Sequence, residues 1–85
     1  MTHVQKCILI LRELYNHKYD GSNYWISKIC ESQNIPIANS EELRGIVSSL
    51  DRNGFISCTV WGISDHSTRI SSRGIEEVEN KFSID

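Results

Sequence analysis

The chain has 85 residues and a net charge of −2, from 9 Lys and Arg residues against 11 Asp and Glu residues. This length predicts one domain over residues 1–85 with a small core. The slightly acidic balance argues against strong nonspecific binding to nucleic acid, which depends on cations that neutralise phosphates. The longest apolar run, Cys7 to Leu11, is far too short to span a bilayer, so we expect no membrane partner.

The cysteines favour a reducing compartment. Cys7, Cys30 and Cys58 form an odd set without the C-x-x-C spacing of zinc or redox sites. Residues 1–4 begin a helical pattern directly and do not resemble a signal peptide. We therefore expect buried free thiols and a cytoplasmic location.

The first predicted element is an amphipathic helix from about Thr2 to His17. Its apolar residues recur every three or four positions and share one face. They are Val4, Cys7, Ile8, Leu11, Leu14 and Tyr15. Leu9 points away from this face and Ile10 lies on its flank. Either Leu9 is a single exposed leucine, or Leu9 and Ile10 form the interface of a homodimer.

A short second helix is predicted before Pro36. Residues 23–25 form either a short strand or the entry to this helix. Pro36 follows its end, because the residue before a proline is pushed out of the α region. Lys28 points outward and either contacts a nucleic-acid backbone or is an ordinary solvated lysine. The apolar face of the helix is Ile26, Ile29 and Cys30.

The third predicted helix begins at Asn39 and Ser40, either of which can cap it. Glu42 lies three residues after Asn39, which is the spacing of a capping box. Gly54 tolerates the positive φ that stops a helix, so the pattern ends there. The buried stripe of this helix is predicted to be Leu43, Ile46, Val47 and Leu50.

Residues 55–70 predict a β-hairpin. The segment 55–61 alternates in the manner of a strand, residues 62–67 have the composition of a turn, and residues 68–70 return as the second strand. A last helix follows, capped by Ser71 or Ser72. Its apolar face is predicted to be Ile75, Val78 and Phe82.

The segment from Ser40 to Ile56 resembles the recognition helix of the winged helix-turn-helix superfamily and its exit into the wing. Small prokaryotic regulators of this type usually end that helix with Leu-x-x-x-Gly and two hydrophobic residues, and residues 50–56 have this form. Residues 70–75 similarly resemble the link from the second wing strand to the last helix. The resemblance covers about residues 4–82. It implies an α+β winged-helix fold, with a three-helix helix-turn-helix core, a two-stranded wing and a C-terminal helix.

The resemblance also implies a DNA-binding surface made by helix 40–52 and the 55–70 wing, often in a dimer. Arg44 and Arg52, on the outer side of that helix, suit guanine edges or phosphates, and Ser48 suits either. Gly45 lets a backbone approach closely, although glycine costs about 1 kcal/mol relative to Ala in a helix interior. The alternative is an ordinary solvated face. The other predicted DNA contacts are Lys28, Ser40, His66, Arg69 and Arg73.

Alternatives stay open for the arginines outside this helix. Arg69 and His66 lie on or beside the wing, where an arginine can enter a minor groove. Arg69 could instead form a surface ion pair with Asp65. Arg73 lies in the first turn of the last helix, where the helix dipole disfavours a cation, so we expect a phosphate or a carboxylate partner there.

Two features weaken the DNA interpretation and favour a protein-binding winged helix, such as an adaptor, inhibitor or assembly factor. The predicted recognition helix opens with Glu41 and Glu42, and the predicted wing tip, residues 63–67, has no Lys or Arg. Many members of the superfamily bind proteins instead of DNA. We nevertheless expect a DNA-binding transcriptional regulator or accessory factor that acts as a homodimer.

No catalytic group of nucleophile, base and oxyanion donors can be assembled from this sequence, so we predict no enzymatic activity and no cofactor. His3 and Cys7 have the i, i+4 spacing of two metal ligands. No third or fourth ligand follows at a recognisable spacing. We therefore predict no metal site.

Overall fold

A computed structural model of the chain describes residues 1–20, 22–61 and 65–81. Within these residues the chain is a small α+β domain of four helices and three strands. In chain order the elements are α1 (His3–Asn16), β1 (Tyr24–Trp25), α2 (Ile26–Ser32), α3 (Ser40–Arg52), β2 (Ile56–Trp61), β3 (His66–Ile70) and α4 (Ser72–Lys81). The predictions for Ile63, Ser64 and Phe82 lie outside the described residues.

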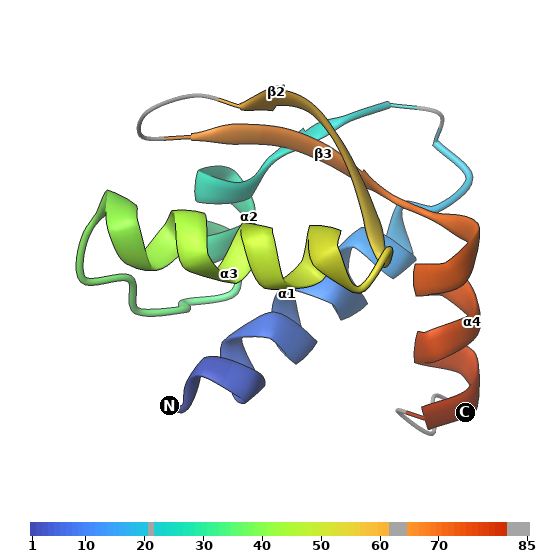
Figure 1. The fold of residues 1–85 in the computed structure, drawn as a ribbon, viewed down its shortest axis with the longest axis horizontal. Coiled ribbons are helices and arrows are strands. Elements are labelled where there is room, and N and C mark those ends of the chain that lie inside the picture. The colour runs from blue at the N-terminus through green and yellow to red at the C-terminus, as the bar shows by residue number, and fades with distance from the viewer. Residues whose placement is uncertain (21, 62–64, 82–85) are drawn as a thin grey trace.

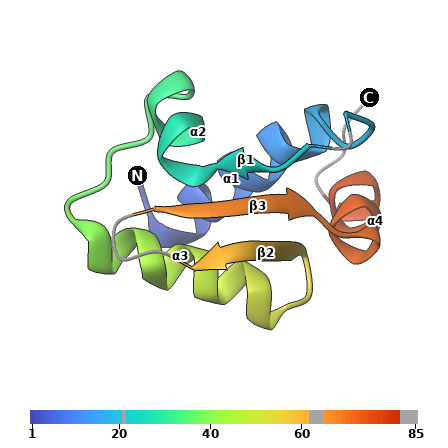
Figure 2. The same cartoon turned by 90° about the horizontal axis from the view of Figure 1, so that it is seen from above.

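The three strands form one antiparallel sheet in the order β1-β3-β2. Tyr24 pairs with Thr68 and Trp25 with Ser67, so β1 joins the predicted hairpin as a third strand. Figure 1 shows α1 and α3 beneath the sheet, and Figure 2 shows α3 running beside β2. This order of elements and strands is compatible with a winged-helix arrangement.

The hairpin departs from the predicted alternation at a bulge in β2. Cys58 pairs with Thr68, but Val60 pairs with Ser67, so Thr59 is an extra residue in β2. β3 begins at His66, two residues earlier than the sequence predicts. Successive side chains of a strand point to opposite faces. The face of β3 that lies toward the helices is made by His66, Thr68 and Ile70, and all three are buried.

Short polar motifs fix the ends of α3. The side-chain oxygen of Asn39 accepts a hydrogen bond from the Glu42 N–H at 2.9 Å, which confirms Asn39 as the cap; among the described contacts this is the only half of the predicted capping box that forms. The carboxylate of Glu42 accepts hydrogen bonds from Lys6 Nζ at 2.6 Å and from the Ala38 N–H at 3.4 Å. At the other end, Gly54 has a φ of 76°, the left-handed conformation that the sequence predicts for this stop.

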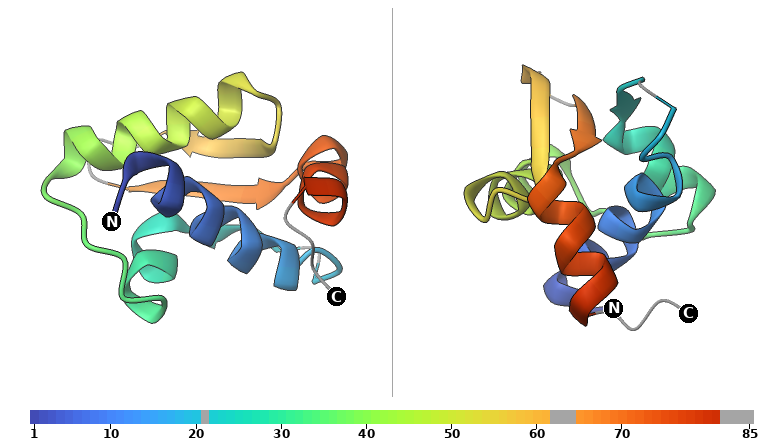
Figure 3. Two further views of the ribbon diagram at one scale, coloured as in Figure 1. Left: turned by 90° about the horizontal axis from the view of Figure 1, so that it is seen from below. Right: turned by 90° about the vertical axis from the view of Figure 1, so that its right-hand side faces the viewer.

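Helix α1 lies at the centre of the helical layer, between α3 and α2 (Figure 3, left). It contacts α2, α3, α4 and β3, so the same chain covers its apolar residues on two sides. Ile10 is 0% exposed, and Leu9 is half-buried against the core. The predicted homodimer interface through Leu9 and Ile10 is therefore wrong for Ile10, because the core of one subunit already uses that side chain.

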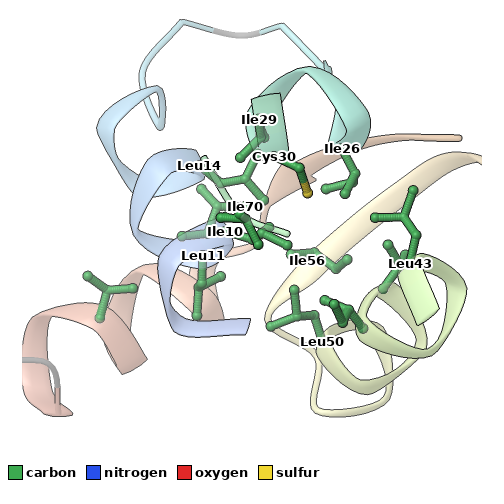
Figure 4. Close-up of a cluster of buried hydrophobic side chains, with 14 residues drawn as sticks. Ile10, Leu11, Leu14, Ile26, Ile29, Cys30, Leu43, Leu50, Ile56 and Ile70 are labelled. Atoms are coloured by element: carbon green, nitrogen blue, oxygen red, sulfur yellow. The ribbon is translucent and has the colours of Figure 1, made fainter. Parts of the chain in front are cut away.

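The core fills the space between the sheet and the helices. In Figure 4, aliphatic side chains of α1, α2 and α3 meet Ile56 and Ile70 from the sheet. Val78 of α4 is also completely buried. The predicted stripe of α3 is confirmed, since all four of its residues are in this core. None of the described helices has the length and apolarity needed to cross a membrane.

Candidate nucleic-acid interface

Helix α3 turns one side to the core and presents the other to solvent. At about 100° per residue, Glu41, Gly45, Ser48 and Arg52 form one row along the outer side, and Arg44 flanks that row. Ser48 is half-buried and the other four are exposed. We call these five residues the outer row of α3. The structure therefore brings together four of the five contacts that the sequence predicts within this helix, all except Ser40.

The two flanks of the outer row face different parts of the chain. On one flank the charge of Arg44 acts on His66, at the start of β3. On the other flank His3 Nε2 lies 3.2 Å from Ser49 Oγ, and Lys6 Nζ lies 2.6 Å from the Glu42 carboxylate, so this flank meets α1. The outer row thus lies between the β2–β3 hairpin and the N-terminal half of α1.

Gly45 is not required by the packing of the chain. A Cβ atom built at this position meets none of the described residues within 4 Å, and the helix is regular there. Glycine in a helix interior destabilises by about 1 kcal/mol relative to Ala. Gly45 therefore lowers the stability of the helix, and no contact among the described residues requires a glycine there. A molecule docked closely on the outer row would require one.

Two acidic residues near the outer row, Glu42 and Asp65, are hydrogen-bonded by neighbouring groups. The hydrogen bond from Lys6 lowers the pKa of Glu42, the second of the two glutamates at the start of α3. The Asp65 carboxylate accepts hydrogen bonds from Ser27 Oγ at 2.5 Å and from the Ser27 N–H at 3.0 Å. Burial acts to raise the pKa of Asp65, but these bonds and one from the His66 N–H outweigh it and lower the pKa.

All four arginines among the predicted DNA contacts are exposed. Among the residues that the structure describes, none of the four forms an ion pair with an acidic side chain, and all are exposed. They are Arg44, Arg52, Arg69 and Arg73. Glu41 and Asp51 are also exposed on α3, so the local charge of its surface is mixed.

His66 is not a surface residue, and its predicted contact with DNA is wrong. Its side chain is 0% exposed on the helix-facing side of β3. Burial lowers the pKa of His66, and the positive charge of Arg44 lowers it further, while the Asp65 carboxylate acts in the opposite direction. The sequence assigns this residue to a polar turn, but the strand begins there and the helices cover it.

The arginines outside α3 lie apart from Arg44. Arg69 is three residues along β3 from His66, about 10 Å, and lines a small cleft with His17 and Tyr24 at the end of α1. The side chain of Arg73 packs over the turn after α3, with its Cδ 3.2 Å from a Cβ built at Gly54. A cation is favourable at this C-terminal helix end, which gives Arg73 a structural role within the fold.

The two remaining predicted contacts are exposed but not part of the outer row. Lys28 lies on α2, with its Nζ 3.9 Å from the Glu31 carboxylate. Ser40 is the first residue of α3 and lines an open cleft of about 570 Å³ between α2 and α3, with Cys30 and Leu43 on its floor. Burial and the Asp65 charge raise the pKa of Cys30 to about 11, while Lys6 acts to lower it, so this thiol stays protonated at neutral pH.

The sequence does not reveal the pair of hydrogen bonds between Asp65 and Ser27. These bonds join the start of β3 to the first turn of α2, across 38 residues. A lone aspartate after a polar turn gives no signal of its partner. This link holds the hairpin to the helical layer, and so fixes where the hairpin lies relative to α3.

No protein-family model matches the chain, and neither a curated protein nor a solved structure matches it. Among the described residues no three potential metal-ligating side chains come together. The function of this chain is therefore inferred from the geometry of α3 and its neighbours.

Proposed function

We propose that the chain is a winged-helix DNA-binding protein, a transcriptional regulator or accessory factor. The outer row of α3 would lie in the major groove of duplex DNA, and the β2–β3 hairpin would contact the adjacent backbone. The order of helices and strands supports this proposal, because it sets one helix beside one hairpin. The proposal implies a cytoplasmic location and a role in transcriptional regulation.

The observation that carries the proposal is that Gly45 and two exposed arginines, Arg44 and Arg52, lie on one solvent-facing side of α3. Gly45 leaves room for a phosphate backbone or a base edge to approach the helix. Arg44 lies next to it and Arg52 lies two turns further along the outer row, so each can reach a phosphate or a guanine edge. One helix with two cations reads few bases, so we expect modest affinity for a single site.

Protein binding is the second candidate, and the mixed charge of α3 is the observation that favours it. Glu41 stands in the outer row and Asp51 lies beside it, both exposed. A carboxylate in this position opposes phosphate and suits a basic or apolar protein surface. A side chain of such a partner would use the space above Gly45 as readily as a phosphate would.

A salt titration with matched variants separates the two candidates. Fluorescence anisotropy with a labelled random duplex, between about 25 and 200 mM salt, should give binding that weakens steeply as salt rises. Arg44→Ala and Arg52→Ala should each weaken binding about tenfold and reduce the salt slope by about one. Arg12→Ala removes an equally exposed arginine from α1 and serves as the control.

The outcomes are distinct. Equal losses for Arg12→Ala and Arg44→Ala would show that any surface cation contributes and that α3 has no special role. Absence of duplex binding at the lowest salt would reject the DNA proposal and leave protein binding as the function of the outer row.

A further inference from the structure

The face of the sheet that points away from the helices carries an exposed tryptophan and an exposed arginine. Trp25 of β1 pairs with Ser67, so its side chain lies on the face of Ser67 and Arg69, opposite the buried face of β3. Trp25 is 45% exposed, and Arg69 is also exposed. Figure 2 looks onto this face, and no described helix crosses the strands there.

The strands of this sheet carry no negative charge. The residues of β1, β2 and β3 include no Asp or Glu, and Arg69 is their only Lys or Arg residue. Ser57, which stands directly opposite Arg69 on β2, is exposed and uncharged. An anion that approaches this face therefore meets a cation and no carboxylate of the strands, unlike the outer row of α3, which contains Glu41.

A second cation and a second exposed aromatic ring lie at the end of this face. Lys18, which follows α1, lines the same small cleft as Arg69. Its Nζ lies 4.8 Å from the centre of the Tyr19 ring, and Tyr19 is 87% exposed. Across the strands, Trp25 is a diagonal neighbour of Arg69 at about 7–8 Å. These contacts place two aromatic rings on either side of two cations, in a series that we call the aromatic–cation row: Tyr19, Lys18, Arg69 and Trp25.

We propose that the aromatic–cation row binds single-stranded DNA, with unpaired bases stacked on Trp25 and Tyr19 and phosphates held by Lys18 and Arg69. An unpaired base offers its ring faces for stacking, whereas the bases of a duplex are already stacked on one another. Exposed aromatic side chains combined with cations bind single strands with little sequence preference. The choice of DNA over RNA rests on the proposed function, but the assignment to an unpaired strand does not.

One carboxylate beside the row limits the affinity. Asp20 accepts a hydrogen bond from the Tyr24 hydroxyl at 2.5 Å, and it lies 2.9 Å from Nδ1 of His17. These two contacts, with Tyr24 first, lower the pKa of Asp20, so its carboxylate is ionised at neutral pH and opposes a phosphate. We therefore expect a dissociation constant of about 10–100 μM for a short single strand at low salt.

The test is a titration of the full chain against a labelled oligo(dT) of about ten nucleotides, read by fluorescence anisotropy. Wild type should bind, and binding should weaken as salt rises. Trp25→Ala should weaken binding about tenfold, because one stacked base is lost. Arg69→Ala should also weaken binding and should reduce the salt slope by about 0.7, because one phosphate contact is lost.

Tyr19→Ala keeps the test decisive if Trp25→Ala proves unstable. Its side chain is 87% exposed, so the variant should fold as wild type does and should bind oligo(dT) more weakly. The matched controls are Arg12→Ala, which removes an exposed arginine from α1, and Val4→Ala, which shortens a side chain that is 63% exposed. Both should bind as wild type does, and circular dichroism should show every variant folded.

Two results would overturn the proposal. One is the absence of oligo(dT) binding by wild type up to about 1 mM protein. The other is equal affinity of wild type, Tyr19→Ala and Arg69→Ala. Tighter binding of oligo(U) than of oligo(dT) would overturn the assignment to DNA.

The single-strand titration is read separately from the duplex titration. Arg44→Ala should leave oligo(dT) binding unchanged, and a loss as large as that of Arg69→Ala would show that the strand lies on α3 and would reject the aromatic–cation row. A chain that binds oligo(dT) but no duplex would reject the proposed function and leave this inference standing. A chain that binds duplex through Arg44 but does not bind oligo(dT) would do the reverse.

Discussion

Two glycines that both lie within helices have opposite surroundings in this molecule. A Cβ atom at Gly74, near the start of α4, would lie 2.1 Å from the carbonyl oxygen of Phe55 and 2.7 Å from a side-chain carbon of Ile70. A Cβ atom at Gly45, in the middle of α3, would meet no atom within 4 Å in the part of the chain that the structure describes. Gly74 is therefore required by the fold, whereas Gly45 is not.

The same contrast extends to the two regions around these glycines. At the junction of α3, β2 and α4, Ser71 Oγ donates to the Gly54 carbonyl oxygen at 2.5 Å and accepts from the Gly74 N–H at 3.0 Å. The Ser71 N–H donates to the Phe55 carbonyl oxygen at 3.0 Å. On the outer row of α3 the arginines have no ion pair among the described residues. The described polar groups of the junction bond to one another, whereas the arginines of the outer row are exposed to solvent.

The largest expected effect is that of Gly74→Ala. The added methyl group would overlap the Phe55 backbone, which has no side-chain freedom to move away, so α4 must shift from the sheet. We expect the free energy of unfolding to fall by about 3 kcal/mol or more, measured by urea denaturation. A loss below about 1 kcal/mol would show that the junction is as tolerant as the outer row.

Gly45→Ala should have a smaller effect of the opposite sign. Replacing glycine by alanine in an exposed helix interior should raise the free energy of unfolding by about 0.5–1 kcal/mol. The same variant should bind its ligand more weakly, because the methyl group fills the space above the helix. A variant that is more stable and binds duplex DNA as tightly as wild type would show that nothing approaches the helix at Gly45.

The smallest expected effect tests whether the charge of Arg44 is coupled to the β2–β3 hairpin beside it. The pKa of His66 lies below its ordinary value of 6.5 in the folded chain, because of burial first and the Arg44 charge second. As pH falls below about 6.5 the unfolded chain therefore binds more protons than the folded chain, and the free energy of unfolding decreases. Arg44→Ala removes one cause of the lowered pKa, so this decrease should become shallower.

Urea denaturation at pH 7.5, 6.5 and 5.5 would measure the difference between wild type and Arg44→Ala. The difference isolates the effect of Arg44, since other titrating groups are common to both proteins. Arg52→Ala is the control, because Arg52 is not among the charges that act on His66. Identical pH dependences for wild type and Arg44→Ala would show that the outer row and the hairpin are electrostatically independent.

Much of the fold could be predicted because local patterns dominate its helices. The three- and four-residue spacing of the α3 stripe, the Asn39 cap and the Gly54 stop agree with one another, and the structure contains all three. Such features depend on residues within a few positions of each other, so no tertiary information is needed to find them. The outer row could be predicted for the same reason, since the buried stripe fixes the opposite side.

The errors come from residues whose surroundings are made by distant segments. Ile10 lies on the flank of the α1 stripe, so the periodicity does not show whether it is buried or exposed. Its burial follows only from the packing of α2, α3, α4 and the sheet around that helix. His66 belongs to a polar segment and is buried only because β3 starts there and lies over the helical layer. The alternation of residues 55–61 does not predict the register of the hairpin, because the bulge at Thr59 is set by the pairing of β2 with β3.

The amino-acid pattern by itself determined where the helices begin and end, which side of α3 is buried, and that the chain is a small α+β domain, since these depend on periodicity and short capping motifs. Tertiary structure alone decided that Gly74 is indispensable and Gly45 is not, that Asp65 binds Ser27, and that Lys18 and Arg69 line one cleft. The physical reason is that each of these properties is defined by atoms far apart in the chain. Only packing brings them within contact distance.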